Sequence, residues 1–141
     1  MLGPVSISNE YHPMSKELVM GFLERNRLSE PLARMVEPRH PPVRRTIASW
    51  TERELAHATA GFAQLERLVE EVERGERAVP VMLRHYLRLD ARLLALNVDH
   101  DFGEAIDALM LVDLAEIDRR ILRHYVGDEG VASLQARISA P

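Results

Sequence analysis

Two apolar segments in the C-terminal third, residues 92–99 and 107–114, constrain the fold most. They read RLLALNVD and DALMLVDL, and both have the composition of largely buried strands. The connection between them is polar at its start and contains Gly103. It is too short for the crossover of about a dozen residues that parallel strands require. The sequence therefore predicts an antiparallel strand pair.

The remaining elements follow from the spacing of apolar residues. A strand is expected at residues 5–8, where Val5 and Ile7 alternate with serines. Helices are expected at residues 14–26, 51–73 with a break at Gly61, 81–89, 115–125 and 129–138. The expected fold class is α/β (α+β), in a single domain spanning residues 1–141.

One helix start is marked clearly. Thr51 and Glu54 have the spacing of a capping box, in which each side chain accepts a hydrogen bond from the backbone of the other residue. Trp50 and Leu55 occupy the two positions of a hydrophobic staple. A helix beginning at this point is therefore predicted.

Residues 28–49 have the character of an internal linker. Four of the eight prolines fall there, and no helical or strand period is visible among them. The segment also gathers positive charge, with Glu37 as the one acidic residue between positions 31 and 50 and the arginines Arg34, Arg39, Arg44 and Arg45. We expect this linker to be extended or poorly ordered.

Composition and charge exclude several classes of protein. The net charge of −4 argues against nucleic acid as a partner. The absence of cysteine excludes disulfides, thiolate nucleophiles and cysteine-ligated zinc. The apolar runs are far shorter than the roughly 20 residues of a membrane-spanning helix, and no signal peptide is visible at the N-terminus. The expected location is cytoplasmic, at most with peripheral contact at the inner face of the membrane.

Two stretches resemble a known family. LGPVSISNEYHPMSKELV and AVPVMLRHYLRLDARLLALNVDHDFGEAIDALMLVDL are similar to segments of the hemolysin-like GNAT-type N-acyltransferases, relatives of the N-acyl amino acid synthases and ornithine-lipid N-acyltransferases. Together with the weakly matching linker, they span residues 2 to about 130. The resemblance implies the C-terminal half of a GNAT-like fold. Its sheet would be short and mixed, with the antiparallel pair at its end and helices flanking it.

The resemblance also implies an activity. It is the transfer of a fatty acyl group from acyl carrier protein or coenzyme A to an amine of an amino acid or amino lipid, as in bacterial lipid biosynthesis. Acyl carrier protein thioester or acyl-CoA would be a co-substrate, and no cofactor would be bound tightly. The alternative is a non-catalytic interaction module of the same fold, forming a homo-oligomer through the open sheet edge at residues 5–8.

The sequence departs from the family at the donor site. The family usually has a Gly-rich turn before the strand that residues 5–8 represent, and residues 1–4 contain no such turn. Backbone N–H groups at a helix start hold the donor phosphates in this fold. Residues 14–26 also lack the tyrosine with which many GNAT enzymes protonate the thiolate. The sequence therefore predicts weak or absent binding of acyl-CoA.

The preferred functional cluster follows the first strand. Asn9 and Tyr11 are candidate catalytic residues, to hold a carbonyl oxygen and to donate a proton. Ser6, Ser8 and Ser15 are candidate substrate-binding residues, since ligands of open α/β sheets bind where strands end. A structural explanation remains open, with Asn9 forming an Asx turn and Ser15 capping the helix.

Charged pairs on two helices are candidates for carrier docking. Arg84 and Arg88 lie four apart, as do Arg119 and Arg123, and such stripes could dock an acidic acyl carrier protein. A solvated helical face is the alternative. The run 99–101 (DHD) reads better as a polar turn than as a metal site, because adjacent strand residues point to opposite faces. No metal role is assigned.

Overall fold

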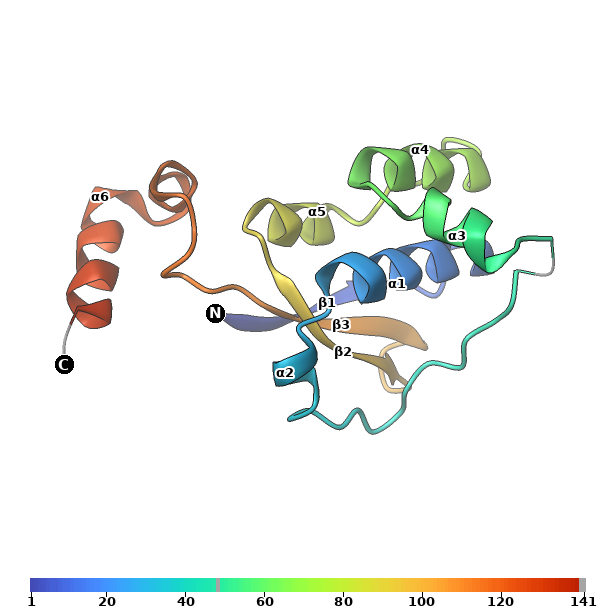
Figure 1. Ribbon diagram of the computed structural model, residues 1–141, viewed down its shortest axis with the longest axis horizontal. Helices are drawn as coiled ribbons and strands as arrows, with labels where there is room; N and C mark the ends of the chain where they lie inside the picture. Colours follow the sequence, from blue (N-terminus) through green and yellow to red (C-terminus); the bar gives the residue numbers. More distant parts are fainter. Residues whose placement is uncertain (48, 140–141) are drawn as a thin grey trace.

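The computed structural model describes residues 1–47 and 49–139, which form an α+β fold (Figure 1). The expected mixture of strands and flanking helices is confirmed. In chain order the elements are β1 (Leu2–Ile7), α1 (Pro13–Arg27), α2 (Glu30–Ala33), α3 (Glu52–Ala58), α4 (Phe62–Val72), α5 (Val81–Arg88), β2 (Arg92–Asp99), β3 (Ala105–Leu111) and α6 (Arg119–Ile138).

The sheet has the order β1-β3-β2 within the described ranges. The predicted antiparallel pair is confirmed as β2 and β3, although β3 lies two to three residues earlier than expected. The expectation of a mixed sheet is wrong, because β1 also pairs antiparallel with β3. β3 lies between β1 and β2 and runs antiparallel to both. Among the described residues, parallel pairing is limited to an isolated bridge between Leu28 and Leu93.

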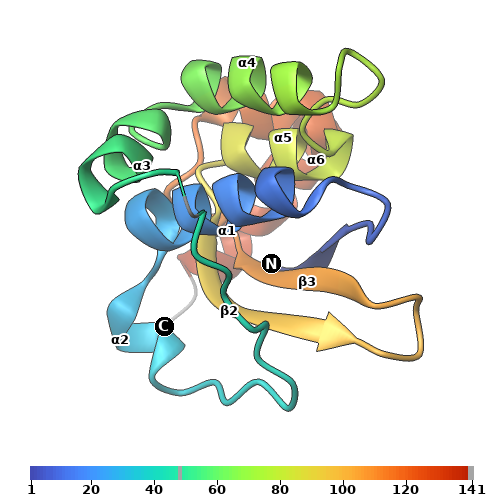
Figure 2. The ribbon, with the colours of Figure 1, turned by 90° about the vertical axis from the view of Figure 1, so that its right-hand side faces the viewer.

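The helices lie mainly on one face of the sheet. Both ribbon views show α1 directly above the sheet, with α3 and α4 in a further layer above α1 (Figures 1 and 2). Because α1 is covered on two sides, it buries Leu18, Val19, Phe22 and Leu23 almost completely. The ring of Phe22 packs against Phe62 of α4, with 6.0 Å between ring centroids. The core therefore consists of the helix-facing side of the sheet, α1 and the helices above it.

The helix boundaries confirm the local signals at most positions. The capping box of Thr51 and Glu54 starts α3, and Gly61 separates α3 from α4. The expected helix start at residue 115 is wrong. Asp118 caps the helix by accepting a hydrogen bond from the Arg120 N–H at 2.7 Å, so α6 begins at Arg119. Gly127, with a φ of 69°, divides α6 at the predicted position.

The linker is anchored to the body of the molecule. Residues 30–33 form the short helix α2, whereas residues 36–47, called the connecting segment below, contain neither helix nor strand and bend at residues 39–40. His40 pairs with the outer edge of β2, since its carbonyl accepts from the Val98 N–H at 2.7 Å and its own N–H donates to Asn97 Oδ1 at 2.8 Å. The expected linker also includes residue 48, which lies outside the described residues. The edge of β2 is thus covered by the chain itself.

The opposite edge, along β1, is open on one side as the sequence predicts. Met1 and Val112 exchange two backbone hydrogen bonds, at 2.7 and 2.8 Å. Antiparallel pairs alternate between hydrogen-bonded and non-bonded positions, so the backbone groups of Leu2, Pro4 and Ser6 face outward. Pro4 has no N–H, and a proline at this position weakens pairing with a further strand.

Candidate functional site

The residues predicted to form one site after β1 are only partly brought together. The Ser6 hydroxyl donates to Asp107 Oδ1 at 2.6 Å, and Ser8 Oγ accepts from the Glu10 N–H at 3.2 Å. The side-chain oxygen Oδ1 of Asn9 accepts from Lys16 Nζ at 2.8 Å. These three side chains line a shallow hollow beside the β2–β3 turn. The polar contacts of this group are therefore already made within the chain.

Tyr11 points away from this group. Its hydroxyl donates to the carbonyl of Ala78 at 2.6 Å, in the segment before α5. Partial burial and, to a smaller extent, the neighbouring Glu73 raise the pKa of Tyr11 above its usual value of 10.0. A phenol whose proton is engaged and held more tightly is a poor match for the proposed catalytic proton donor.

Ser15 also lies away from the group. It is buried on α1, and its hydroxyl has no hydrogen-bond partner among the described residues. The helix is capped instead by His12, whose Nδ1 accepts from the Met14 N–H at 3.1 Å. The explanation of Ser15 as a cap is therefore wrong. Pro13 occupies the first helical position, so the cap is the residue directly before it, His12.

The arginine stripes on α5 and α6 are partly neutralised within the chain. Arg84 Nε lies 2.8 Å from Glu66 Oε1, and Arg123 Nε lies 2.6 Å from Asp128 Oδ1. Neither Arg88 nor Arg119 forms an ion pair within residues 1–47 and 49–139. Carrier docking through the four arginines stays a prediction, for which Arg88 and Arg119 are the more available cations.

Another site lies where the connecting segment crosses the start of α1 and the end of the β2–β3 hairpin. We call it the hairpin cleft. Its volume is about 540 Å³, which falls in the usual range for small-molecule sites. The apolar part of its lining comes from Met20, Pro41, Pro42, Val98 and Ile106, and the polar part from Asn9, Lys16, Glu17, Arg39, His40, Arg45, His100 and Glu104.

Three cations of the hairpin cleft have no acidic partner within the part of the chain that the structure describes. In that part, Lys16 Nζ hydrogen-bonds only to the neutral amide of Asn9. The side chains of Arg39 and Arg45 form no ion pair in the described parts of the chain, whereas several arginines elsewhere do. Both carboxylates of the lining, Glu17 and Glu104, are already engaged. The cleft is therefore electropositive in a chain whose net charge is −4.

A pair of imidazoles lies beside these cations. His100 Nδ1 is 2.8 Å from Glu104 Oε1, which fixes the orientation of the ring, and Nε2 has no hydrogen-bond partner among the described residues. The ring of His40 meets the ring of His100 edge-on, with 4.6 Å between centroids. An imidazole oriented by a carboxylate is an arrangement that can accept and return a proton.

The polar turn at residues 99–101 is confirmed. Asp99 Oδ1 accepts from the N–H groups of Asp101 and Phe102 at 3.0 and 3.1 Å. Within the described ranges, no three histidine, aspartate or glutamate side chains gather into a group that could hold a metal ion.

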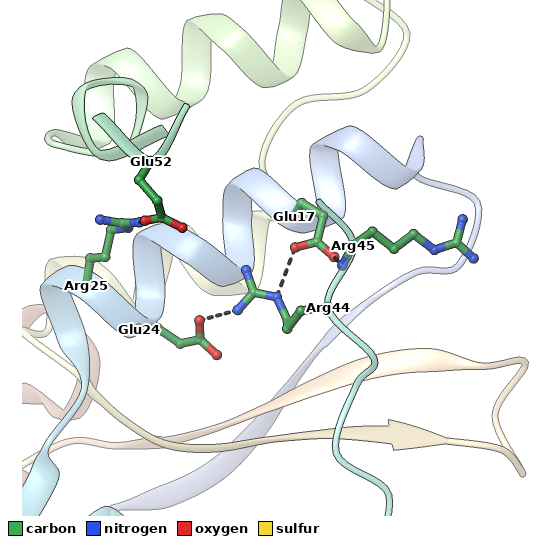
Figure 3. A network of polar contacts seen from close by, with 6 residues as sticks. All are labelled: Glu17, Glu24, Arg25, Arg44, Arg45 and Glu52. Atoms are coloured by element: carbon green, nitrogen blue, oxygen red, sulfur yellow. Dashed lines mark hydrogen bonds and ion pairs between the residues drawn. The ribbon is translucent and has the colours of Figure 1, made fainter. Parts of the chain in front are cut away.

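The buried carboxylate of Glu17 holds the connecting segment over the cleft. Its two oxygens accept from Arg44 Nε at 2.9 Å and from the backbone N–H of Arg45 at 2.7 Å (Figure 3). Arg44 also pairs with Glu24, and Arg25 pairs with Glu52 at 3.0 Å. Burial tends to lower the pKa of Arg44, but its hydrogen bonds to Glu24 and Glu17 outweigh burial and raise it. Arg44 therefore stays charged and fixes the segment.

Sequence reasoning missed the hairpin cleft as a site. Arg39 and Arg45 were visible as part of a basic stretch, and His100 as part of a polar turn. The signal that could have joined them is the combination of a basic, proline-rich linker with a histidine at a hairpin turn. The linker lies far from the hairpin in sequence, and only the pairing of His40 with β2 brings the two together.

Comparison with known proteins adds no relative: no family model, no curated protein and no solved structure matches the chain. No helix in residues 1–47 and 49–139 combines the length and apolar character needed to cross a bilayer.

Proposed function

We propose that the chain is the acceptor-side part of an N-acyltransferase, and that the hairpin cleft binds the acceptor amine. The single observation that carries this proposal is a set of unpaired cations, Lys16, Arg39 and Arg45, beside a carboxylate-oriented imidazole, His100. The cations suit the carboxylate or phosphate of an amino acid or amino lipid. The imidazole can accept a proton from the amine of the same acceptor molecule. The resemblance to hemolysin-like N-acyltransferases supports the same assignment.

The proposed chemistry is aminolysis of a fatty acyl thioester. The amine nitrogen attacks the thioester carbonyl, a C–N bond forms, and the C–S bond breaks. His100 Nε2 accepts the proton that the nitrogen loses and returns it to the departing thiolate. Glu104 keeps the ring in place through the contact of its Oε1 with His100 Nδ1 at 2.8 Å. The products are an N-acyl amine and the free thiol of the carrier.

The donor is proposed to be acyl carrier protein thioester rather than coenzyme A. The helix starts at Pro13 and Val81 are poor pyrophosphate sites, since Pro13 and the cap residue Pro80 lack an N–H. An acidic carrier protein could instead dock through surface arginines such as Arg88 and Arg119. These proposals imply a cytoplasmic reaction. Calorimetric titration with acyl-CoA at physiological salt is expected to show a dissociation constant weaker than micromolar.

The proposed reaction is tested by incubating the chain with acyl carrier protein thioesters and a panel of amines, with mass spectrometry of the products. N-acylation of amino acids or amino lipids is expected, preferentially of amines that also carry an anionic group. His100→Gln should reduce turnover about 100-fold or more. The matched control is His124→Gln, because His124 lies on α6, outside the cleft. Equal turnover by both variants would contradict the role of His100.

A non-catalytic interaction module is the second candidate, favoured by the open edge of β1. It predicts a dimer in which two β1 strands pair. Pro4 removes an outward N–H from that edge and argues for a weak association at most. Light scattering across a concentration series distinguishes the two candidates when it is combined with the activity test. A stable dimer without turnover would favour the interaction module, and turnover by a monomer would exclude it.

A further inference from the structure

A further hollow lies between α3 and α4, on the other side of the helical layer from the β2–β3 hairpin (Figure 1). Its volume is about 720 Å³, and its lining includes Trp50, Arg53, His57, Ala58, Gln64 and Leu68. We call it the α3–α4 groove. It shares no lining residue with the hairpin cleft, so it is a separate place in the molecule.

The walls of the groove are apolar for a structural reason. Ala58 is buried, and Trp50 and Leu68 pack from the side against the main core. The chain breaks at Gly61, so α3 and α4 meet at an angle and do not cover one another fully (Figure 1). The apolar side chains of Trp50, Ala58 and Leu68 therefore line a hollow between these two helices.

The charged groups at the rim are unequal in availability. Glu54 is turned back onto its own helix start, because Oε2 accepts from the Thr51 N–H at 2.7 Å and from the Thr51 hydroxyl at 2.9 Å. Arg53 forms no ion pair among the described residues. His57 lies one helical turn beyond Arg53 and therefore projects from the same face of α3. The available charge at the rim is thus positive.

We infer that the α3–α4 groove binds a single-chain anionic amphiphile, such as a long-chain fatty carboxylate. The apolar chain lies along Trp50, Ala58 and Leu68, and the headgroup pairs with Arg53, with His57 as a second donor. A neutral lipid would leave Arg53 unpaired. This inference does not rest on the proposed function, because it concerns a different site and requires no reaction.

The chain provides its own reporter, since Trp50 is its single tryptophan and lines the groove. Bromine atoms quench tryptophan fluorescence at short range. A long-chain fatty acid brominated in mid-chain, below its micellar concentration, is expected to quench Trp50 saturably. The matching brominated fatty alcohol should bind about 10-fold more weakly, because it lacks the charge that Arg53 neutralises.

Two substitutions make the test specific. Arg53→Ala, at an exposed position, is expected to weaken binding of the fatty acid about 10-fold without changing stability. Arg67→Ala is the matched control, because Arg67 is also exposed and lies on α4 outside the lining of the groove. Absence of saturable quenching would overturn the inference. Equal affinities for acid and alcohol, or equal affinities of the two arginine variants, would overturn it as well.

Discussion

Arg44 and Arg45 are neighbours in the chain, but they have opposite environments. The guanidinium of Arg44 lies against α1 between Glu17 and Glu24, and its Nε is 2.9 Å from Glu17 Oε2 (Figure 3). Arg45 gives only its backbone N–H to Glu17, and its side chain extends away from that carboxylate. One arginine therefore fixes the connecting segment, and the side chain of the next is the one proposed to bind a ligand.

The difference lies in the surroundings of the two side chains. Arg44 faces the carboxylates of Glu17 and Glu24 on α1. Arg45 lines the hairpin cleft, and its side chain forms no ion pair within the described residues. A run of basic residues can therefore combine a structural role and a binding role, and the two roles should separate on substitution.

The largest expected effect comes from removing Glu17, the residue that both arginines share. Glu17→Ala leaves Arg44 and the Arg45 N–H without their buried acceptor, and should lower the free energy of unfolding by about 3 kcal/mol. Urea denaturation measures this. The matched control is Glu24→Gln. The Glu24 side chain is 41% exposed, so this substitution should lower the free energy of unfolding by about 1 kcal/mol or less. Equal losses for the two variants would show that Glu17 does not anchor the segment.

Arg44→Ala should cause the next largest loss of stability. It leaves the Glu17 carboxylate buried with a single remaining donor, and should cost about 2 kcal/mol of unfolding free energy. The comparison variant is Arg45→Ala, which should change stability by less than about 0.5 kcal/mol. Denaturation of the two proteins side by side checks the division of roles. If Arg45→Ala costs as much as Arg44→Ala, the two arginines do not differ in the way described.

A smaller effect, of opposite sign, is expected at Gly21 of α1. A Cβ at this position would lie 3.8 Å from Arg44 Nη2 and 3.9 Å from the Thr59 methyl, both ordinary contacts. Gly21→Ala should therefore stabilise the protein by about 0.5–1 kcal/mol, because alanine favours the helix more. Thermal unfolding shows whether Gly21→Ala is more or less stable than the original protein. Destabilisation would mean that Arg44 packs more tightly on α1 than these distances indicate.

The fold was readable where its signals are local. The capping box at Thr51, the break at Gly61 and the strand pair joined by a short turn each depend on a few neighbouring residues, and each is confirmed. The order of the sheet was not readable, because the pairing of β1 with β3 joins residues about 100 positions apart. Periodicity gives the faces of an element and does not identify its neighbours.

The candidate site shows the same limit. Asn9 does lie at the hairpin cleft, as one of its lining residues. Tyr11 and Ser15 were grouped with it by closeness in sequence, but the turn and the first helical residues rotate them toward Ala78 and the core. Arg39, Arg45 and His100 come from two distant segments, so no spacing rule could join them.

The central claim is that the hairpin cleft binds an anionic amine through unpaired cations. The most direct test is calorimetric titration of the chain and of Arg45→Ala with an N-acetyl amino acid, a short-chain analogue of the proposed product that lacks the long apolar chain proposed to fill the α3–α4 groove. Saturable binding is expected, and it should weaken about 10-fold in Arg45→Ala while the free energy of unfolding stays within about 0.5 kcal/mol. Equal affinity in both proteins, or no binding to either, would contradict it.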